Sequence, residues 1–220
     1  MSEIAKSKNA ELPLSGIDDD LIAEIAVAYQ NELRAQKAVD FDDLLLLGER
    51  VLREYPEVRE YWQERFQYVT VDEFQDTNNL QMKLLQQLVG EPYNICVVGD
   101  DDQSIYGWRG AQVANILQFE RFFPNPKIIR LEDNYRSTQA VLEVANSLIR
   151  HNVGRREKKL RPTIPGGDLV RLVSMPGDQE EAEWIVSEIL MQREEGRVLE
   201  DFAILFRTNV QIRKMEEVLR

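Results

Sequence analysis

Three carboxylates and an amide follow a short run of β-branched and aromatic residues at positions 68–71. The acids are Asp72, Glu73 and Asp76, with Gln75 among them. The run has the composition of a buried strand, and open α/β sheets bind ligands at the carboxyl ends of such strands. The first acid could hold a hydrated Mg²⁺, and the second could take a proton from an attacking water. An ordinary acidic turn is the alternative interpretation of an Asp-Glu pair considered alone.

A second polar loop follows the next apolar run of the chain. Asp100 and Gln103 come first, and Tyr106, Trp108 and Arg109 follow. Because neighbouring parallel strands place their following loops at one edge of the sheet, we expect Asp100 and Gln103 to lie beside the first acidic stretch. Gln103 could hydrogen-bond a terminal phosphate or position a water. The two aromatic rings and the arginine suit single-stranded nucleic acid, where stacking contributes about 1–3 kcal/mol per base.

The surrounding sequence predicts the elements that must position these loops. Residues 1–16 are polar and are expected to be loosely ordered. Cap residues and apolar spacing predict helices over residues 18–36, 40–55, 56–62, 78–89 with Gly90 as its C-cap, 112–122, 138–150, 179–195 and from Asn209. Apolar runs predict strands over residues 68–71, 93–100, 127–131, 169–174 and 202–206. The alternation of strand and helix indicates parallel sheets with flanking helices.

Charge is distributed unevenly along the 220 residues. The net charge is −12, but residues 1–100 carry 20 acids and 9 bases, whereas residues 101–220 carry 19 and 18. Six bases lie within twelve residues: Arg150, Arg155, Arg156, Lys158, Lys159 and Arg161. Such a cluster could contact phosphates, although a solvated surface is the commoner explanation.

Several classes of protein are disfavoured by what the sequence contains. Cys96 is the only cysteine and His151 is the only histidine. The chain therefore cannot form an internal disulfide, and it lacks the residues for a His/Cys metal site. No apolar run is long enough to span a membrane, and the first residues lack the apolar core of a signal peptide. We therefore expect a cytoplasmic protein without a membrane partner.

Three longer stretches carry a resemblance to a known family. Residues 71–77, 97–111 and 131–138 resemble motifs II, III and IV of the UvrD/Rep/PcrA helicases. Residues 40–45 resemble motif Ic, and residues 206–209 resemble motif IVa. These superfamily 1 enzymes use ATP to move 3′→5′ on single-stranded DNA. The resemblance runs from about residue 20 to the end of the chain. DEAD-box helicases share the Asp-Glu pair but not the sequence of residues 99–111.

The resemblance implies roles for individual residues in nucleotide chemistry. Asp72 would coordinate Mg²⁺, and Glu73 would activate the hydrolytic water. Gln103 would sense the γ-phosphate of ATP and couple it to the adjacent DNA loop. Tyr135 would stack on the adenine, and Arg136 would act as an arginine finger, a device that contributes roughly 10³- to 10⁵-fold in rate in nucleotide hydrolases.

The resemblance also implies partners and a division into domains. Tyr106, Trp108 and Arg109 would face DNA, with Arg207 and Asn209 as weaker candidates. The partners would be single-stranded DNA, junctions between single and double strands, and other repair proteins, in DNA repair or replication. The implied fold is part of two P-loop NTPase (RecA-like) α/β domains preceded by a helical segment. Residues 1–37 would be the remnant of an inserted 1B-type subdomain, 38–131 half of the first motor domain, and 132–220 the first part of the second.

One part of the expected nucleotide site has no counterpart in the sequence. A Walker A loop needs Gly-Lys, and none of the 11 glycines is followed by lysine. The family's motifs V and VI are also absent. We therefore expect an internal helicase segment that is inactive alone, with an uncovered sheet edge that causes poor solubility or self-association. The alternatives are a non-catalytic module that binds single-stranded DNA or a protein partner, and the motor part of a helicase–nuclease.

Overall fold

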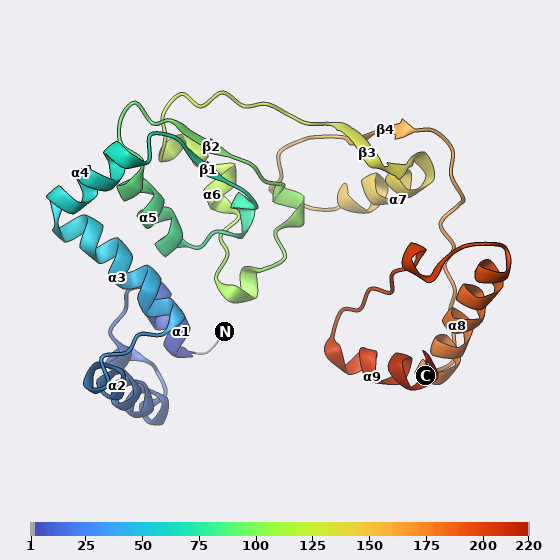
Figure 1. Cartoon of the computed structure of the whole chain (residues 1–220), viewed down its shortest axis with the longest axis horizontal. Coiled ribbons are helices and arrows are strands. Elements are labelled where there is room, and N and C mark those ends of the chain that lie inside the picture. The colour runs from blue at the N-terminus through green and yellow to red at the C-terminus, as the bar shows by residue number, and fades with distance from the viewer. Residues whose placement is uncertain (1–2, 220) are drawn as a thin grey trace. The chain divides into compact units, whose positions relative to one another are not determined.

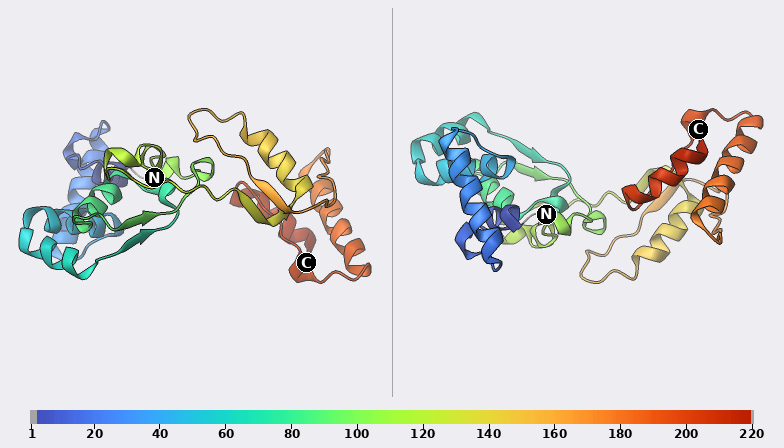
Figure 2. Two further views of the ribbon diagram at one scale, coloured as in Figure 1. Left: turned by 90° about the horizontal axis from the view of Figure 1, so that it is seen from above. Right: turned by 90° about the horizontal axis from the view of Figure 1, so that it is seen from below.

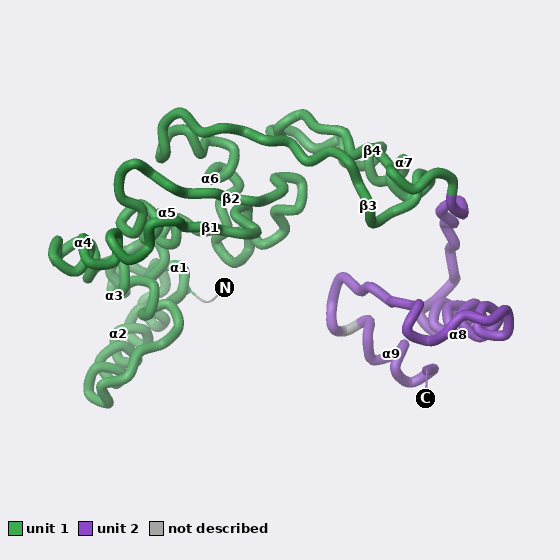
Figure 3. The backbone as a smooth tube through the Cα atoms, turned by 45° about the horizontal axis from the view of Figure 1, so that its top comes forward, with its two compact units in different colours: residues 1–166 green, residues 167–220 purple. Residues whose placement is uncertain are grey.

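The structure is a computed structural model in which helices outnumber short strands (Figures 1 and 2). It describes residues 3–219, apart from the side chain of Val210. The described residues form two compact units that divide between Gly166 and Gly167 (Figure 3). The predicted domain boundary near residue 132 is a different division, and it stays a prediction.

Three of the predicted helices stand at the start of the first unit. They are α2 (Asp20–Ala35), α3 (Phe41–Glu54) and α4 (Pro56–Arg65). The Asp19 side chain caps α2, and Asp40 forms a capping box with Asp43 at the start of α3. These carboxylates satisfy backbone N–H groups that have no partner inside the helix, which is why the sequence located the helix starts.

The expectation of loose order before residue 16 was wrong. The segment forms α1 (Glu3–Asn9) and the 3₁₀ turn η1 (Leu14–Gly16). Lys8 is only 4% exposed, and its Nζ lies 2.6 Å from Asp40 Oδ2 and 2.8 Å from Asp43 Oδ1. The carboxylates that hold Lys8 lie more than 30 positions away, so the local composition did not reveal them.

A parallel strand pair forms the centre of the first unit. Strands β1 (Val69–Val71) and β2 (Ile95–Val97) pair in register, with Val69 opposite Ile95. Helix α5 (Asn79–Leu88) connects them, after the 3₁₀ turn η2 (Phe74–Asp76). The predicted strand, helix and strand are confirmed, although both strands are shorter than expected. The C-cap prediction was wrong, because Val89 rather than Gly90 caps α5 through its bond to the Leu85 carbonyl.

The main apolar core packs beneath this pair. Phe74, Met82, Val89 and Phe123 are buried together, and the rings of Phe74 and Phe119 pack in a T-shaped arrangement with 5.6 Å between centroids. The helix predicted over residues 112–122 is broken into α6 (Ala114–Leu117) and the 3₁₀ turn η5 (Phe119–Arg121). The break at Gln118, which has φ −118° and ψ 28°, lies directly before the phenylalanines that enter this core.

The prediction of a third strand over residues 127–131 was also wrong. Within the described residues this segment pairs with no strand, and Ile128, Ile129 and Leu131 are exposed. An apolar run fits a strand only where a neighbour supplies hydrogen bonds, and the sequence of the run does not show that neighbour.

A second parallel pair follows. Strand β3 (Asp133–Thr138) leads into α7 (Gln139–Ile149), and β4 (Arg161–Ile164) returns beside β3 with Asp133 opposite Arg161. The two strands lie side by side next to α7, in yellow and orange (Figure 2). The helix was predicted, but neither β3 nor β4 was. Pro162 disfavours a strand at residues 161–164 except at the edge of a sheet.

The second unit contains two packed helices. These are α8 (Asp178–Glu194) and α9 (Asn209–Leu219), with the 3₁₀ turn η6 (Leu199–Asp201) between them. Ala182 and Met215 are its buried apolar residues within the described part of the chain. Both helices were predicted. The strands predicted over residues 169–174 and 202–206 are absent from the described structure. As at residues 127–131, no neighbouring strand supplies hydrogen bonds to these apolar runs. No helix among residues 3–219 is long and apolar enough to cross a membrane.

Candidate functional site

The two loops singled out in the sequence meet at the carboxyl ends of β1 and β2. Hydrogen bonding continues past the strands, since Val98 N–H donates to the Val71 carbonyl at 2.8 Å and Phe74 N–H donates to the Val98 carbonyl at 3.0 Å. The parallel register therefore brings the acidic stretch that follows β1 against the loop that follows β2.

A buried glutamine joins the two loops. Gln75 is 1% exposed, and its Nε2 donates to Glu73 Oε2 at 2.7 Å. Its Oε1 accepts from the Asp100 N–H at 3.0 Å, and its carbonyl accepts from Ser104 Oγ at 3.2 Å. Sequence reasoning assigned Gln75 no role. The available signal was its position between the acids, where a side chain that both donates and accepts can bridge two loops.

The chain of hydrogen bonds continues to Gln103. The side chain of Gln103 donates through Nε2 to Asp100 Oδ2 at 2.8 Å, in the 3₁₀ turn η3 (Asp101–Gln103). Glu73, Gln75, Asp100 and Gln103 thus form one continuous series of contacts. The predicted juxtaposition of Glu73, Asp100 and Gln103 is confirmed by these distances.

The carboxylates after β1 lack cationic partners. Within the described residues no ion pair reaches Asp72, Glu73 or Asp76. Asp72 and Glu73 are exposed, and Glu73 has left-handed backbone angles of φ 50° and ψ 40°. Burial raises the pKa of the Asp76 carboxyl, and the charge of Glu73 raises this pKa further. Asp76 Oδ1 is buried without a hydrogen-bond partner.

These oxygens fit a Mg²⁺ ion that is shared with a phosphate. Mg²⁺ prefers oxygen ligands and commonly uses one or two carboxylates plus substrate phosphates. Within the described residues Asp72 keeps Oδ2 free, because the Glu73 N–H donates to Oδ1 alone. Among residues 3–219 no group of three or more acidic, histidine or cysteine side chains forms a complete metal site. The donors therefore suit a partial site rather than a protein cage.

The aromatic loop projects into solvent. Trp108 is 60% exposed and lies in the 3₁₀ turn η4 (Gly107–Arg109). The Arg109 guanidinium lies 4.6 Å from the Trp108 ring centroid and 5.1 Å from that of Tyr106. Gly110 has φ 89°, a conformation that favours glycine, and it ends the turn. Trp108 therefore belongs to an exposed loop and not to the apolar core.

The remaining candidates lie on other elements. Tyr135 and Arg136 are exposed on β3, in the first unit. No hydrogen bond or ion pair in the described part of the chain joins the Arg136 side chain to Glu73 or Gln103. Arg207 and Asn209 are exposed in the second unit, where Asn209 begins α9. Their roles stay predictions.

Two family models together match almost the whole chain. The UvrD/REP helicase N-terminal domain matches residues 3–124, and the UvrD-like helicase C-terminal domain matches residues 129–220. The ATP-dependent DNA helicase PcrA of Staphylococcus epidermidis is 42% identical over 216 residues, which is 98% of this chain and 30% of that protein. PcrA of Staphylococcus aureus is 40% identical with the same coverage. The chain thus spans 30% of the length of these curated relatives.

Proposed function

Because the chain belongs to the UvrD/REP helicase family, we propose that it supplies a catalytic half-site and a DNA-binding loop to an ATP-dependent helicase that moves 3′→5′ on single-stranded DNA. The observation that carries this proposal is the series of hydrogen bonds from Glu73 through Gln75 and Asp100 to Gln103. It ends three residues before the exposed aromatic loop. A change at the nucleotide would therefore reach the DNA contact through a short, partly buried path.

The nucleotide side of the site uses oxygen and amide chemistry. Asp72 would hold Mg²⁺ together with ATP, and the ion would neutralise phosphate charge. Glu73 would accept a proton from the attacking water. Gln75 fixes the Glu73 carboxylate by donating to Oε2, which leaves Oε1 for the water. Gln103 would hydrogen-bond the γ-phosphate, and Tyr135 and Arg136 on β3 would contact the adenine and the γ-phosphate.

The DNA side of the site uses stacking and a cation. Tyr106 and Trp108 offer ring faces to successive bases, and Arg109 supplies charge for a phosphate. Arg207 and Asn209 are further proposed DNA contacts. Junctions between single and double strands are the proposed site of unwinding, in DNA repair or replication. We propose that residues 1–220 alone hydrolyse little ATP, because the sequence contains no Walker A loop.

A binding assay on the 220-residue chain tests the DNA side directly. We expect a fluorescent oligothymidylate to show rising anisotropy at low salt, and binding to weaken as salt rises. Trp108→Ala should weaken binding roughly 5- to 150-fold, the equivalent of about 1–3 kcal/mol for one stacked base. Tyr61→Ala is a matched control, because Tyr61 on α4 is 55% exposed and lies outside the aromatic loop.

The same assay separates the proposal from its alternatives. Equal losses in Trp108→Ala and Tyr61→Ala, or no binding at low salt, would count against the DNA loop. A non-catalytic binding module would bind DNA with no response to nucleotide. The proposed half-site predicts that millimolar Mg-ATP changes the affinity for DNA and that Gln103→Ala removes this change.

A further inference from the structure

Part of the basic cluster is bound to the turn that carries Gln103. Lys158 Nζ lies 2.5 Å from both Asp100 Oδ1 and Asp101 Oδ1, and 3.3 Å from Asp102 Oδ2. Arg155 holds Asp102 with two hydrogen bonds, Nε to Oδ1 at 2.8 Å and Nη2 to Oδ2 at 2.5 Å. The cluster was expected to contact phosphate or to be solvated surface. In the structure these two residues pair with carboxylates, and a phosphate contact stays a prediction.

This network is partly removed from water. The side chain of Asp102 is 8% exposed and that of Arg155 is 16% exposed. A paired arginine fork and carboxylate in such a setting form a stronger and more directional contact than an exposed ion pair. Arg156 adds a backbone contact, because its N–H donates to Asp101 Oδ2 at 2.8 Å. Residues 155–159, here called the basic segment, therefore hold residues 100–103, here called the acidic turn, in one conformation.

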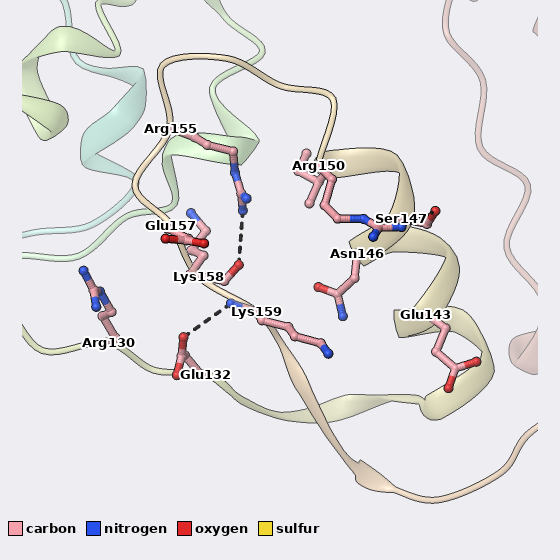
Figure 4. A pocket seen from close by; sticks show the side chains of 11 residues that line it. Arg130, Glu132, Glu143, Asn146, Ser147, Arg150, Arg155, Glu157, Lys158 and Lys159 are labelled. Carbon is pink, nitrogen blue, oxygen red and sulfur yellow. Dashed lines mark hydrogen bonds between the residues drawn. The ribbon is translucent and has the colours of Figure 1, made fainter.

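The basic segment is also tied to β3, the strand that carries Tyr135 and Arg136. Figure 4 shows Arg155 donating to the Lys158 carbonyl and the Lys159 N–H donating to Glu132, at 3.4 Å and 3.3 Å. Directly after it, the Arg161 N–H donates to the Glu132 carbonyl at 2.7 Å. Residues 155–161 thus connect the Gln103 turn to the start of β3.

We propose that Lys158 is a positioning residue for Gln103, acting through Asp100. Asp100 uses its two oxygens for different partners: Oδ1 accepts from Lys158 and from the Asp102 N–H, and Oδ2 accepts from Gln103. Fixing one oxygen fixes the plane of the carboxylate and hence the direction in which the Gln103 amide is held. The inference rests on the proposed role of Gln103 in nucleotide sensing. It adds a connection from that sensor, through residues 155–161, to the strand that carries Arg136.

The charge state of Asp100 agrees with this geometry. Burial alone would raise the pKa of the Asp100 carboxyl, but hydrogen bonds from Lys158 and Gln103 and the charge of Lys158 outweigh it and lower the pKa. Burial alone would lower the pKa of the Lys158 ammonium, and its acidic partners raise it instead. At neutral pH the contact is therefore between a full positive and a full negative charge.

Lys158→Gln in the 220-residue chain tests the proposal, with Lys159→Gln as the matched control. Lys159 is the next residue, and its side chain makes no ion pair within the described structure. NMR would report the titration of the Asp100 carboxyl and the exchange of the Gln103 side-chain amide protons. We expect Lys158→Gln to raise the pKa of Asp100 and to speed Gln103 amide exchange roughly 5- to 10-fold, as for the loss of about one hydrogen bond.

The controls distinguish positioning from general destabilisation. Lys159→Gln should leave both signals unchanged, and Lys158→Arg should restore slow exchange, because arginine can still donate to Asp100. A folded Lys158→Gln protein with unchanged Gln103 exchange would overturn the inference. If Lys158→Gln does not fold, a pH titration of the wild-type chain is the second test. The NMR chemical shift of the Gln103 side-chain amide should follow the titration of Asp100. A shift that does not change with pH would refute the contact between Gln103 and Asp100 on which the inference depends.

The same samples separate this inference from the proposed function. If Gln103 order depends on Lys158 but Mg-ATP never changes DNA affinity, the positioning stands and the proposed function fails. If Mg-ATP changes DNA affinity but Gln103 order is independent of Lys158, the proposed function stands and the positioning fails.

Discussion

Gly99 lies against Phe74 and Gln75 of the neighbouring loop, so Gly99→Ala tests the packing of the two loops of the site. A Cβ at this position would lie 2.5 Å from Gln75 Oε1, 2.9 Å from Ile116 Cδ1 and 3.2 Å from the Phe74 nitrogen. The backbone of Gly99 does not need the left-handed region, so the restriction is one of space. Gln75 is 1% exposed and is held on both sides, so its side chain has no free direction in which to move.

The expected cost follows from these contacts. Displacing Gln75 weakens two hydrogen bonds, each worth about 0.5–1.5 kcal/mol. Pressing a methyl group into Ile116 and the Phe74 backbone adds about 1–3 kcal/mol. The two costs are not fully additive, because a movement of Gln75 that weakens its hydrogen bonds also relieves part of the steric overlap. We therefore expect Gly99→Ala to lower the free energy of unfolding by about 2–4 kcal/mol in total.

Urea unfolding followed by circular dichroism measures this change, and Gly48→Ala is the matched control. Gly48 lies within α3 with no atom within 4 Å of an added Cβ, so alanine there should stabilise the chain by about 0.5–1 kcal/mol. Adding Gln75→Ala to Gly99→Ala should cost less than the sum of the single changes, because the blocking side chain is gone. A Gly99→Ala chain as stable as wild type, or fully additive losses, would refute the reasoning.

Two further substitutions test charges whose environment the structure defines. Asp76→Asn should raise the melting temperature at pH 7. The pKa of Asp76 is raised in the folded state, so its charged form destabilises the fold above the unfolded pKa. The advantage of the variant should shrink as pH falls toward 4, and equal melting temperatures at pH 7 would contradict this prediction. Lys8→Met should lower the free energy of unfolding by about 3 kcal/mol, because it leaves Asp40 and Asp43 without their buried cation. Lys6→Met on the exposed face of the same helix is its control, and similar losses in the two variants would be evidence against a special role for Lys8.

The features that the sequence predicted well are those with local causes. Helix α3 begins directly after Asp40, whose side chain accepts from the Asp43 N–H and so caps the helix, and Asn78 caps α5 in the same way. The juxtaposition of Glu73 and Gln103 was also predictable, since two parallel neighbours place their following loops at one edge. In each case the information lies within one helix turn or one strand pair.

The features that were missed depend on partners far along the chain. The order of α1 depends on Lys8 reaching Asp40, and the acidic turn depends on Lys158, which lies 58 positions after Asp100. The run at residues 127–131 has strand-like composition without a strand beside it, whereas β4 forms despite Pro162 because β3 is next to it. The composition of a segment shows how much apolar surface it could bury, but only the folded structure shows which partners it contacts.

Hydrogen exchange of the DNA-bound chain tests the central claim most directly. If the Glu73–Gln103 contacts link the nucleotide half-site to DNA, adding an oligothymidylate should slow amide exchange in residues 99–103 as well as in the aromatic loop at residues 106–109. Gln75→Ala should keep the protection of the loop and lose that of residues 99–103. Protection confined to residues 106–109 in the wild-type chain would contradict the account.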